Sequence, residues 1–517
     1  MTDRRFSREW LLSDAAVLFY LALLAVAVHV LSCQNYGYFR DELYYIACSK
    51  HLDWGYVDQP PLSLLILQIV RSLFGESLVA IRILPAIAGG TIVFIAGLMA
   101  RQLGGGRSAQ VLAALSALAS PIFLSNAGRY FSMNAFDLLF WAIGGYIVLL
   151  IVKNNSERLW LLFGIVAGLG VMNKYSMGFL VIGLVVAMLV TPHRQRLLSK
   201  WFWMGGLLGG LIVLPHILWE IRNNFPTAEF MHNVTYLKNR PISIWEFFLA
   251  QFRDIGIIWF FGFAFYFFHK PAKVFRIFGI LYIVIFVLMA FQNPKPYYLS
   301  PVYPLFFASS GCMIELLARR SRLGWLKPVA FAAVLVQGIV AMPIVLPVLP
   351  VETYVQYQQF LGLVPEREER GAAGILPQHF ADMFGWPEMV DTVALVYKRL
   401  SPEEQAKCMI YVRNYGEAGA IDFFGPKLGL PRASCTHNSY WFWRPDSWSG
   451  EVCIIFGRSN DTTDCFNDLR QFFETVELAA FARCKYAMPY EDGRPIFICR
   501  GAKITLQQLW ERDKLFI

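Results

Sequence analysis

The chain has 517 residues, of which 56% are hydrophobic, 16% aromatic and only 16% charged, and its formal net charge is +9. About a quarter of the residues of an average soluble domain are charged, so this composition excludes an ordinary soluble protein. The apolar excess falls in residues 11–348, in stretches long enough to cross a membrane. Lys and Arg are spread over the short loops between these stretches, so nucleic acid is not expected as a partner.

Eleven apolar segments are predicted to cross the membrane as helices. The fifth and sixth are short and are joined only by residues 173–176, so we expect a tight hairpin there. Leu62–Phe74 is also apolar but too short to span, and Pro61 before it favours a helix lying at the interface. The predicted spans are residues 12–33, 79–100, 108–124, 135–152, 159–172, 177–191, 203–221, 251–268, 275–291, 299–318 and 327–348.

The loops on the side of the N-terminus hold more Lys and Arg than the loops on the other side, which predicts a cytoplasmic N-terminus. Eleven spans then place the loop after the first span and the segment from Val351 onward outside the cytoplasm, in the periplasm of a bacterium. We therefore predict a multi-pass protein of the cell inner membrane that contacts membrane lipids.

The segment from residue 351 has the composition of a globular domain. Short apolar runs predict buried strands, and longer periodic segments predict helices. The predicted fold is therefore mainly α, with a polytopic transmembrane helical bundle at residues 1–350 and a soluble α/β domain at residues 351–517. The predicted strands are Met409–Val412 and Val452–Phe456, and the predicted helices are Pro377–Phe384 and Pro387–Leu400.

Six of the nine cysteines lie in this second domain. An oxidising compartment permits disulfides there, although Cys408 and Cys453 in strand-like runs also fit buried thiols. No Cys-x-x-Cys or Cys/His spacing indicates zinc, so no metal site is predicted.

The loop after the first span carries four carboxylates, on Asp41, Glu42, Asp53 and Asp58. A carboxylate at a membrane boundary costs several kcal/mol unless it meets water or a partner, so this cluster favours chemistry. Asp41, with Glu42 beside it, fits a general base that takes a proton from an acceptor hydroxyl during sugar transfer. The alternative is that Asp41 is the N-cap of a short helix from Glu42 to about His51, and a capping residue can also be active.

Asp58 opens the sequence Asp-Gln-Pro-Pro. Pro60 favours an extended Gln59, and Pro61 suits the first turn of a helix. The motif is either a helix-entry turn or a stiff turn that presents a carboxylate and an amide to a substrate.

Two further charged sites lie near the predicted spans. Lys174, between the two short spans, either snorkels to water or meets an anion in a cavity. Asp137 lies just inside the fourth span, so it should face the bundle interior, with Arg129 as a candidate partner.

Residues 292–304 place Lys295, Tyr297 and Tyr298 on the same outer side, among prolines. One ammonium group and two hydroxyls suit a phosphate held at the interface. The alternative is an aromatic belt with a snorkelling lysine, although prolines on both sides of Lys295 make free snorkelling less natural. Because these motifs converge on one side, carboxylates and cations together suit a lipid-phosphate donor and a hydroxyl acceptor.

In the second domain, Asn414–Gly419 follows a predicted strand. It fits either an anion site at a helix N-terminus or a glycine-containing tight turn. We expect the domain to help shape the acceptor site.

The stretches RDELYYIACSKHLDWGYVDQPPL, SMNAFDLLFW, NKYS and KPYYLSPVYP resemble bacterial membrane glycosyltransferases of the protein O-mannosyltransferase and aminoarabinose transferase superfamily. NYGEAGAIDFFGPKLGLP followed by HNSYWFW resembles a subgroup of these proteins. The resemblance covers residues 10–350 and, more loosely, the second domain. It implies the type C glycosyltransferase fold, an active site on the non-cytoplasmic face, polyprenyl-phosphate sugar donors and inversion of the anomeric centre.

The resemblance also implies individual roles. Asp41 matches the acidic residue of the first outer loop, and Asp58 matches a second acidic position before the proline pair. Gln59 stands where aminoarabinose transferases usually have lysine, and Asn134 stands where related enzymes often have aspartate. An acidic role there is lost or moves to Asp137, and these departures imply a donor or acceptor different from that of the best-known members.

The resulting hypothesis is an enzyme, a polyprenyl-phosphate-dependent hexosyl or pentosyl transferase acting on a lipid, glycan or protein acceptor in the periplasm. It needs no cofactor, because a phosphate monoester is a fair leaving group without a metal ion. The candidate residues fall into three groups: Asp41, Glu42 and Asp58 as catalytic residues; Lys174, Lys295, Tyr297, Tyr298 and Arg129 for the donor phosphate; and Gln59, Asn134 and Asp137 as substrate-shaping residues.

The alternative function is a transporter or flippase of a lipid-linked or anionic substrate, which explains intramembrane charge equally well. Against it, the sequence shows no clear inverted repeat, and the charged groups collect at one interface instead of at mid-membrane.

Overall fold

The computed structural model describes residues 11–239, 241–292, 295–365 and 372–517. Asn293 and Pro294 of the predicted phosphate motif lie outside the described residues. The chain forms two compact units. The first comprises Met1–Asn35, Glu76–Trp219 and Pro241–Pro350, and the second comprises Tyr36–Gly75, Glu220–Arg240 and Val351–Ile517. The division into domains at residue 350 remains a prediction.

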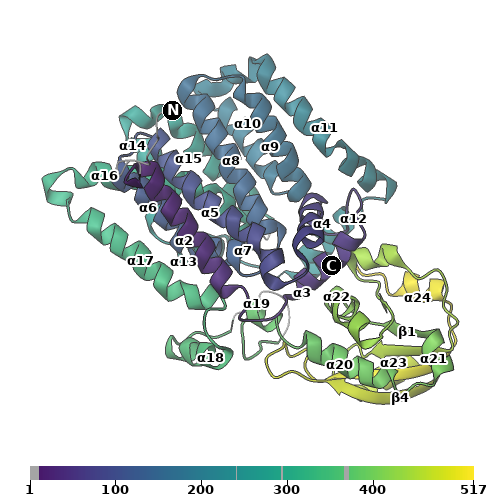
Figure 1. Cartoon of the computed structure of the whole chain (residues 1–517). Coiled ribbons are helices and arrows are strands. Elements are labelled where there is room, and N and C mark those ends of the chain that lie inside the picture. Colours follow the sequence, from purple (N-terminus) through teal and green to yellow (C-terminus); the bar gives the residue numbers. More distant parts are fainter. Residues whose placement is uncertain (1–10, 240, 293–294, 366–371) are drawn as a thin grey trace, which may run out of the picture. The chain divides into compact units, whose positions relative to one another are not determined.

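The first unit is helical (Figure 1). Its longer helices are α2 (Asp14–Ser32), α5 (Leu78–Gln102), α6 (Arg107–Ala119), α7 (Pro121–Gly128), α8 (Met133–Asn154), α9 (Leu159–Asn173), α10 (Met177–Leu189), α11 (Lys200–Arg222, which runs on into the second unit), α13 (Ile244–Ile255), α14 (Phe261–Phe268), α15 (Arg276–Ala290), α16 (Tyr303–Ala318) and α17 (Leu326–Val345). Short 3-10 helices connect them: η1 (Pro192–Leu198), η3 (Ile258–Phe260), η4 (Lys270–Phe275), η5 (Pro296–Val302) and η6 (Ser321–Leu323).

Helices occupy all eleven predicted spans, which confirms a polytopic helical protein. Among the described residues, seven helices are long and apolar enough to cross a membrane, or up to ten if each bent helix pair is one span. The bent pairs are α6 with α7, α10 with η1, and α13 with η3 and α14, and the bends measure 62°, 115° and 110°. The remaining predicted span forms α9, which has only 15 residues and makes the expected tight hairpin with α10.

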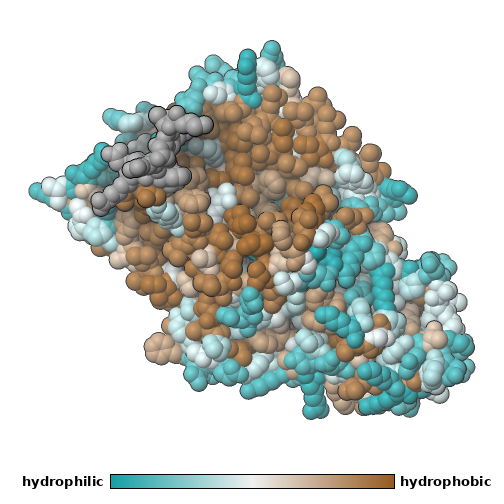
Figure 2. Space-filling model, viewed as in Figure 1, coloured by the Kyte–Doolittle hydropathy of each residue, from teal (hydrophilic) through white to brown (hydrophobic). Residues whose placement is uncertain are grey.

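The surface of the first unit is that of a protein that contacts lipid. Figure 2 shows apolar residues gathered over its helices. Helices α11 and α17 expose large apolar side chains, including Leu207, Leu211, Leu218, Val336 and Ile339. The interior of the first unit contains fully buried aromatic side chains such as Trp259 and Phe306.

The second unit contains a five-stranded mixed sheet with strand order β2-β1-β3-β5-β4. β1 is parallel to β2 and β3, and β5 is antiparallel to β3 and β4. The sheet confirms the α/β prediction and the two predicted strands. The strands are β1 (Cys408–Tyr411), β2 (Ala433–Ser434), β3 (Val452–Phe456), β4 (Phe473–Ala482) and β5 (Arg494–Ala502).

The helices of the second unit come from three parts of the chain. The outer loop contributes α3 (Arg40–Lys50) and α4 (Leu62–Phe74), and residues 220–240 contribute α12 (Pro226–Asn233) and the π-helix η2 (Val234–Lys238). The C-terminal part contributes α18 (Val351–Phe360), α19 (Gln378–Ala381), α20 (Trp386–Tyr397), α21 (Pro402–Lys407), α22 (Tyr415–Phe424), η7 (Gly425–Leu428), η8 (Asn438–Trp443), α23 (Thr462–Arg470) and α24 (Leu506–Arg512). Both helices predicted there are confirmed, the first as the short α19.

All nine cysteines lie in the described residues and all are free thiols. Cys453 and Cys499 face each other in register on β3 and β5 and are buried. Of the two roles left open by the sequence, the structure shows the free thiol, which is buried at Cys453 and partly buried at Cys408.

Helices α3 and α22 pack closely because two glycines face α3. A Cβ atom on Gly419 would lie 2.7 Å from the carbonyl carbon of Leu43, and one on Gly416 would overlap the Arg40 side chain. The motif at residues 414–419 is therefore a helix start built for close packing, with Asn414 as the N-cap of α22.

We expect the Gly419→Ala substitution to destabilise the protein by about 1–3 kcal/mol, because the added methyl meets the α3 backbone, which cannot move aside cheaply. The measurement is the melting temperature of the purified protein. Gly206→Ala is the control, since a Cβ atom there has nothing within 4 Å. A Gly419→Ala protein that melts no lower than Gly206→Ala would contradict this account of the contact.

Candidate active site

The first candidate carboxylate lies within the first turn of α3. The helix begins at Arg40 with Phe39 as its N-cap, and Glu42 Oε2 accepts a hydrogen bond from the Phe39 N–H at 2.9 Å. The alternative reading, in which Asp41 is the N-cap, is therefore wrong, because the fully buried Glu42 fixes the helix start at Phe39, two residues earlier. Glu42 holds the helix end, and the Asp41 side chain is available for other contacts.

Asp41 is held by a residue that is distant in the sequence. The Tyr415 hydroxyl donates to Asp41 Oδ1 at 3.0 Å, and Arg40 Nε lies 3.3 Å from the same oxygen. The Asp41 side chain remains 25% exposed. It is thus a fixed carboxylate with one side open, as a general base requires.

Asp58 is held in the same manner. The Tyr44 hydroxyl donates to Asp58 Oδ1 at 2.8 Å and accepts from the backbone N–H of Ser439 at 3.2 Å. The rings of Tyr44 and Tyr415 are in tilted contact, with their centroids 4.7 Å apart, so a pair of tyrosines links the two carboxylates. Burial raises the pKa of Asp58 to about 6, and the hydrogen bond from Tyr44 opposes that shift.

Gln59 is 1% exposed, and neither its amide oxygen nor its amide nitrogen has a hydrogen-bond partner in the described part of the chain. Ser63, four residues on, has a buried hydroxyl in the same condition. Buried polar atoms almost always have a partner, so these groups suit contact with a ligand or an ordered water molecule.

Arg40, the neighbour of Asp41, belongs to a charged cluster in the second unit. Arg40 donates to the Tyr490 hydroxyl at 3.1 Å and lies 3.5 Å from Asp382. Glu491, which follows Tyr490 in the sequence, accepts a hydrogen bond from the Asn414 amide at 3.0 Å. Burial and the neighbouring Glu417 carboxylate raise the pKa of Glu491.

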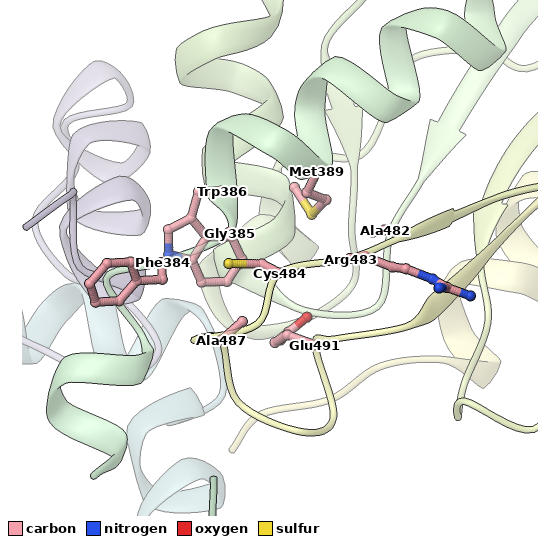
Figure 3. A pocket seen from close by; sticks show the side chains of 9 residues that line it. All are labelled: Phe384, Gly385, Trp386, Met389, Ala482, Arg483, Cys484, Ala487 and Glu491. Atoms are coloured by element: carbon pink, nitrogen blue, oxygen red, sulfur yellow. The ribbon is translucent and has the colours of Figure 1, made fainter. Parts of the chain in front are cut away.

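Glu491 also lines a small pocket of the second unit (Figure 3). The other lining residues are Phe384, Gly385, Trp386, Met389, Ala482, Arg483, Cys484 and Ala487. None of the site residues predicted from the sequence lines this pocket.

The first unit gathers a second set of predicted residues around Lys174. Its ammonium group lies 2.7 Å from Asn134 Oδ1 and 3.7 Å from Asp137 Oδ2. It also lies over the rings of Tyr297 and Tyr298, at 5.4 and 5.3 Å. The Ser176 hydroxyl donates to Asp137, so the partners of Asp137 are Lys174 and Ser176, and the expectation that Arg129 is its partner is wrong.

Arg129 follows α7 and precedes Asn134 by five residues. Its side chain is buried, it stacks over Tyr130 at 5.1 Å, and no described carboxylate lies within salt-bridge distance of it. Its Nε atom also has no hydrogen-bond partner among the described residues. A buried guanidinium without an acidic partner is a suitable site for an anion. Lys295, at the start of η5, lies in the same unit.

The sequence did not identify Tyr44, Tyr415 or Ser439 as site residues. Tyr415 lies in the motif whose glycines were noted, and Ser439 lies in the HNSYWFW stretch. The roles of Tyr415 and Ser439 depend on contacts with the outer loop, hundreds of residues away in the sequence.

Residues 58–219 match the family model described as dolichyl-phosphate-mannose-protein mannosyltransferase. The chain is 24% identical over 252 residues to the lipid A galacturonosyltransferase RgtD of Rhizobium johnstonii (strain DSM 114642 / LMG 32736 / 3841). That match covers 48% of this chain and 53% of the relative, so the chain aligns with about half of its length.

Two solved structures share the fold over nearly the whole chain. The crystal structure of ArnT from Cupriavidus metallidurans bound to undecaprenyl phosphate has a TM-score of 0.60 and 16% identity, and the alignment covers 94% of this chain and 98% of ArnT. The apo structure of ArnT gives a TM-score of 0.58 and 14% identity, with 93% and 97% covered. Together with the family match, these results confirm the resemblance to bacterial membrane glycosyltransferases, and the chain has the ArnT-like fold.

We expect the Asp58→Asn substitution to stabilise the protein at pH 7.5 and not at pH 4. The folded state binds the Asp58 proton more tightly than the unfolded chain, whose Asp pKa is about 3.9. Between about pH 4 and pH 6 the free energy of unfolding of the wild type therefore falls as the pH rises. Above about pH 6 the wild type keeps the full destabilisation that comes from burying the ionised Asp58 carboxylate. A pKa raised by about two units corresponds to on the order of 3 kcal/mol.

Melting temperatures of the wild type and the Asp58→Asn variant at the two pH values test this expectation. Asp446→Asn is the control, because Asp446 is exposed. An equal difference between wild type and Asp58→Asn at both pH values would show that burial does not disfavour the charged form of Asp58.

Proposed function

We propose that the protein is a glycosyltransferase that moves a sugar from a polyprenyl-phosphate donor to a hydroxyl group of an acceptor. The observation that carries the proposal is that one set of candidate residues supplies carboxylates and the other supplies cations. Asp41 and Asp58 supply carboxylates on the outer loop, whereas Lys174 and the buried Arg129, which pairs with no described carboxylate, supply cations. A base for the acceptor and an anion site for the leaving phosphate are the two requirements of this reaction.

The proposed chemical step is a single displacement at the anomeric carbon. Asp41 accepts the proton of the acceptor hydroxyl as its oxygen forms a bond to that carbon. The bond between the anomeric carbon and the phosphate oxygen breaks, and the polyprenyl phosphate leaves with the electron pair. The anomeric centre is inverted.

The negative charge on the leaving phosphate grows during this step, so cations and hydroxyl donors lower the barrier. We assign this role to Lys174, Arg129, Lys295 and the hydroxyls of Tyr297 and Tyr298. Lys174 already neutralises Asp137, and its contact with Asn134 is neutral, which leaves it donors for a phosphate.

The comparisons support the choice of substrates. ArnT, whose fold this chain shares, was crystallised with undecaprenyl phosphate, and RgtD is named for transfer to lipid A. We therefore propose an undecaprenyl-phosphate-linked sugar as the donor. The acceptor is a hydroxyl of a lipid, glycan or protein, and the name of RgtD favours a lipid.

We also propose an inner-membrane location with a cytoplasmic N-terminus and the residues after 350 in the periplasm. The bias of Lys and Arg between the loops supports this orientation. The amphipathic helix α4 supports a membrane boundary in the outer loop, because its exposed face carries Leu65, Ile69, Leu73 and Phe74. No observation favours the transporter alternative, and the relatives reported above are transferases.

We expect the Asp41→Asn substitution to lower kcat by about a hundred- to ten-thousand-fold, because an amide cannot accept the acceptor's proton. The assay follows transfer of radiolabelled sugar from a panel of undecaprenyl-phosphate sugars by purified protein in lipid nanodiscs. Asp53→Asn is the matched control, since Asp53 is an exposed carboxylate of the same loop. Near-normal turnover of Asp41→Asn with the true substrates would remove the proposed base.

Replacing the ion pair by Lys174→Gln together with Asp137→Asn should weaken binding of undecaprenyl phosphate by about 10- to 100-fold, the loss expected for one charge-assisted hydrogen bond. The double change keeps the net charge of the pair, so no buried carboxylate is left unpaired. The measurement is lipid binding by native mass spectrometry.

Lys153→Gln is the control for this pair. Lys153 lies on the same helix as Asn134, roughly 28 Å along α8, and bonds to Gln102. Equal binding by the double variant and by Lys153→Gln would place the phosphate elsewhere.

A further inference from the structure

Both hydrogen bonds to the Asp41 carboxylate end on the same oxygen. Tyr415 donates to Oδ1 at 3.0 Å, and Arg40 donates to Oδ1 at 3.3 Å. Among the described residues, no hydrogen bond reaches Oδ2. With one oxygen anchored and the side chain 25% exposed, the second oxygen is the atom available to a substrate.

Tyr415 is held rigidly enough to act as an anchor. It is the first residue of α22, whose N-cap is Asn414, and its side chain is 6% exposed. Its ring contacts the ring of Tyr44 at 4.7 Å and the ring of His437 at 4.7 Å, and Arg40 lies over it at 5.5 Å. The hydroxyl therefore cannot swing away from Asp41 without disturbing three neighbours.

The packing of α22 on α3 fixes the direction of this contact. Gly416 and Gly419 let the two helices approach until side chains larger than hydrogen would overlap α3. This close approach brings the hydroxyl of Tyr415 within reach of the first turn of α3. A hydrogen bond of this kind between residues 374 apart in sequence needs such support, because each partner loses conformational freedom to make it.

We propose that Tyr415 is a positioning residue of the transfer reaction, whose hydroxyl fixes Asp41 Oδ1 and thereby presents Oδ2 to the acceptor hydroxyl. The inference rests on the proposed function, in which Asp41 is the base. It gives the C-terminal part of the chain a direct role in catalysis through one hydrogen bond. Tyr415 itself touches neither sugar nor phosphate and exchanges no proton in the step.

Tyr415→Phe is the test, because it removes the hydroxyl and keeps the ring contacts with Tyr44 and His437. We expect kcat to fall about 10- to 100-fold, the loss typical of one hydrogen bond to a charged group. We expect KM for the undecaprenyl-phosphate sugar to stay within about twofold, since the donor is bound by other residues. Loss of packing alone would lower the amount of folded protein and leave kcat per folded molecule unchanged.

Tyr411→Phe is the matched control. The Tyr411 hydroxyl donates to Asp513 at 2.9 Å and lies within hydrogen-bond distance of Thr436 Oγ1, at 3.2 Å, in the same unit. The variant therefore loses a hydrogen bond to a carboxylate at a site without contact to Asp41. The two variants should have similar melting temperatures, and only Tyr415→Phe should lose kcat.

A double-mutant cycle separates positioning from a general structural effect. In the Asp41→Asn background, measured under single-turnover conditions with labelled donor, Tyr415→Phe should cost less than about threefold. A structural role would give the same fold loss in both backgrounds and would overturn the inference.

The wild-type assay distinguishes this failure from failure of the proposed function. A wild type that transfers sugar, with equal kcat for Tyr415→Phe and Tyr411→Phe, overturns the positioning role alone. A wild type that transfers sugar from none of the undecaprenyl-phosphate donors overturns the proposed function and the positioning role with it.

Discussion

Ionised side chains close to a membrane need a partner, and the way this chain supplies partners determines its candidate site. Asp41 is satisfied by Tyr415 and Arg40, and Asp58 is satisfied by Tyr44. In the first unit, Lys174 and Asp137 satisfy each other. Arg129 differs, because it is buried and no described acidic residue pairs with it. The buried positive charge of Arg129 is the feature that most directly favours an anionic substrate.

Much of the architecture could be predicted because it depends on local sequence. An apolar run of membrane-spanning length forms a helix whatever surrounds it, so helices occupy all eleven predicted segments. The bends between α6 and α7, α10 and η1, and α13 and α14 were not predicted, because apolar composition carries no information on direction. The strands β1 and β3 were found from their short apolar runs, whereas β2 has only two residues and gives no such signal.

The charged residues of the candidate site could be predicted because placing charge near a membrane is costly, whereas Asn134, Tyr297 and Tyr298 were predicted from their motifs. That argument singled out Asp41, Asp58, Lys174 and Asp137. The alternative reading of Asp41 as an N-cap was wrong, since Phe39 is the N-cap of α3 and the buried carboxylate of Glu42 accepts the Phe39 N–H. The argument from charge could not find Tyr415, because a buried tyrosine is ordinary in sequence and its partner is distant. Such contacts are specified by packing, here by Gly419 against α3, and not by a local pattern.

The second unit is discontinuous along the chain, and this has a consequence for how the protein is made. Asp41 leaves the ribosome 374 residues before Tyr415, which at 5–20 residues per second is a delay of about 20 to 75 s. During that interval the outer loop has been synthesised while the α22 that packs against its α3 has not. Helix α3 therefore stays without this packing partner until α22 has been translated. A nascent chain stalled before α22 would carry all the helices described for the first unit and still lack Tyr415, so the contact that holds the Asp41 carboxylate forms only after α22 has been made.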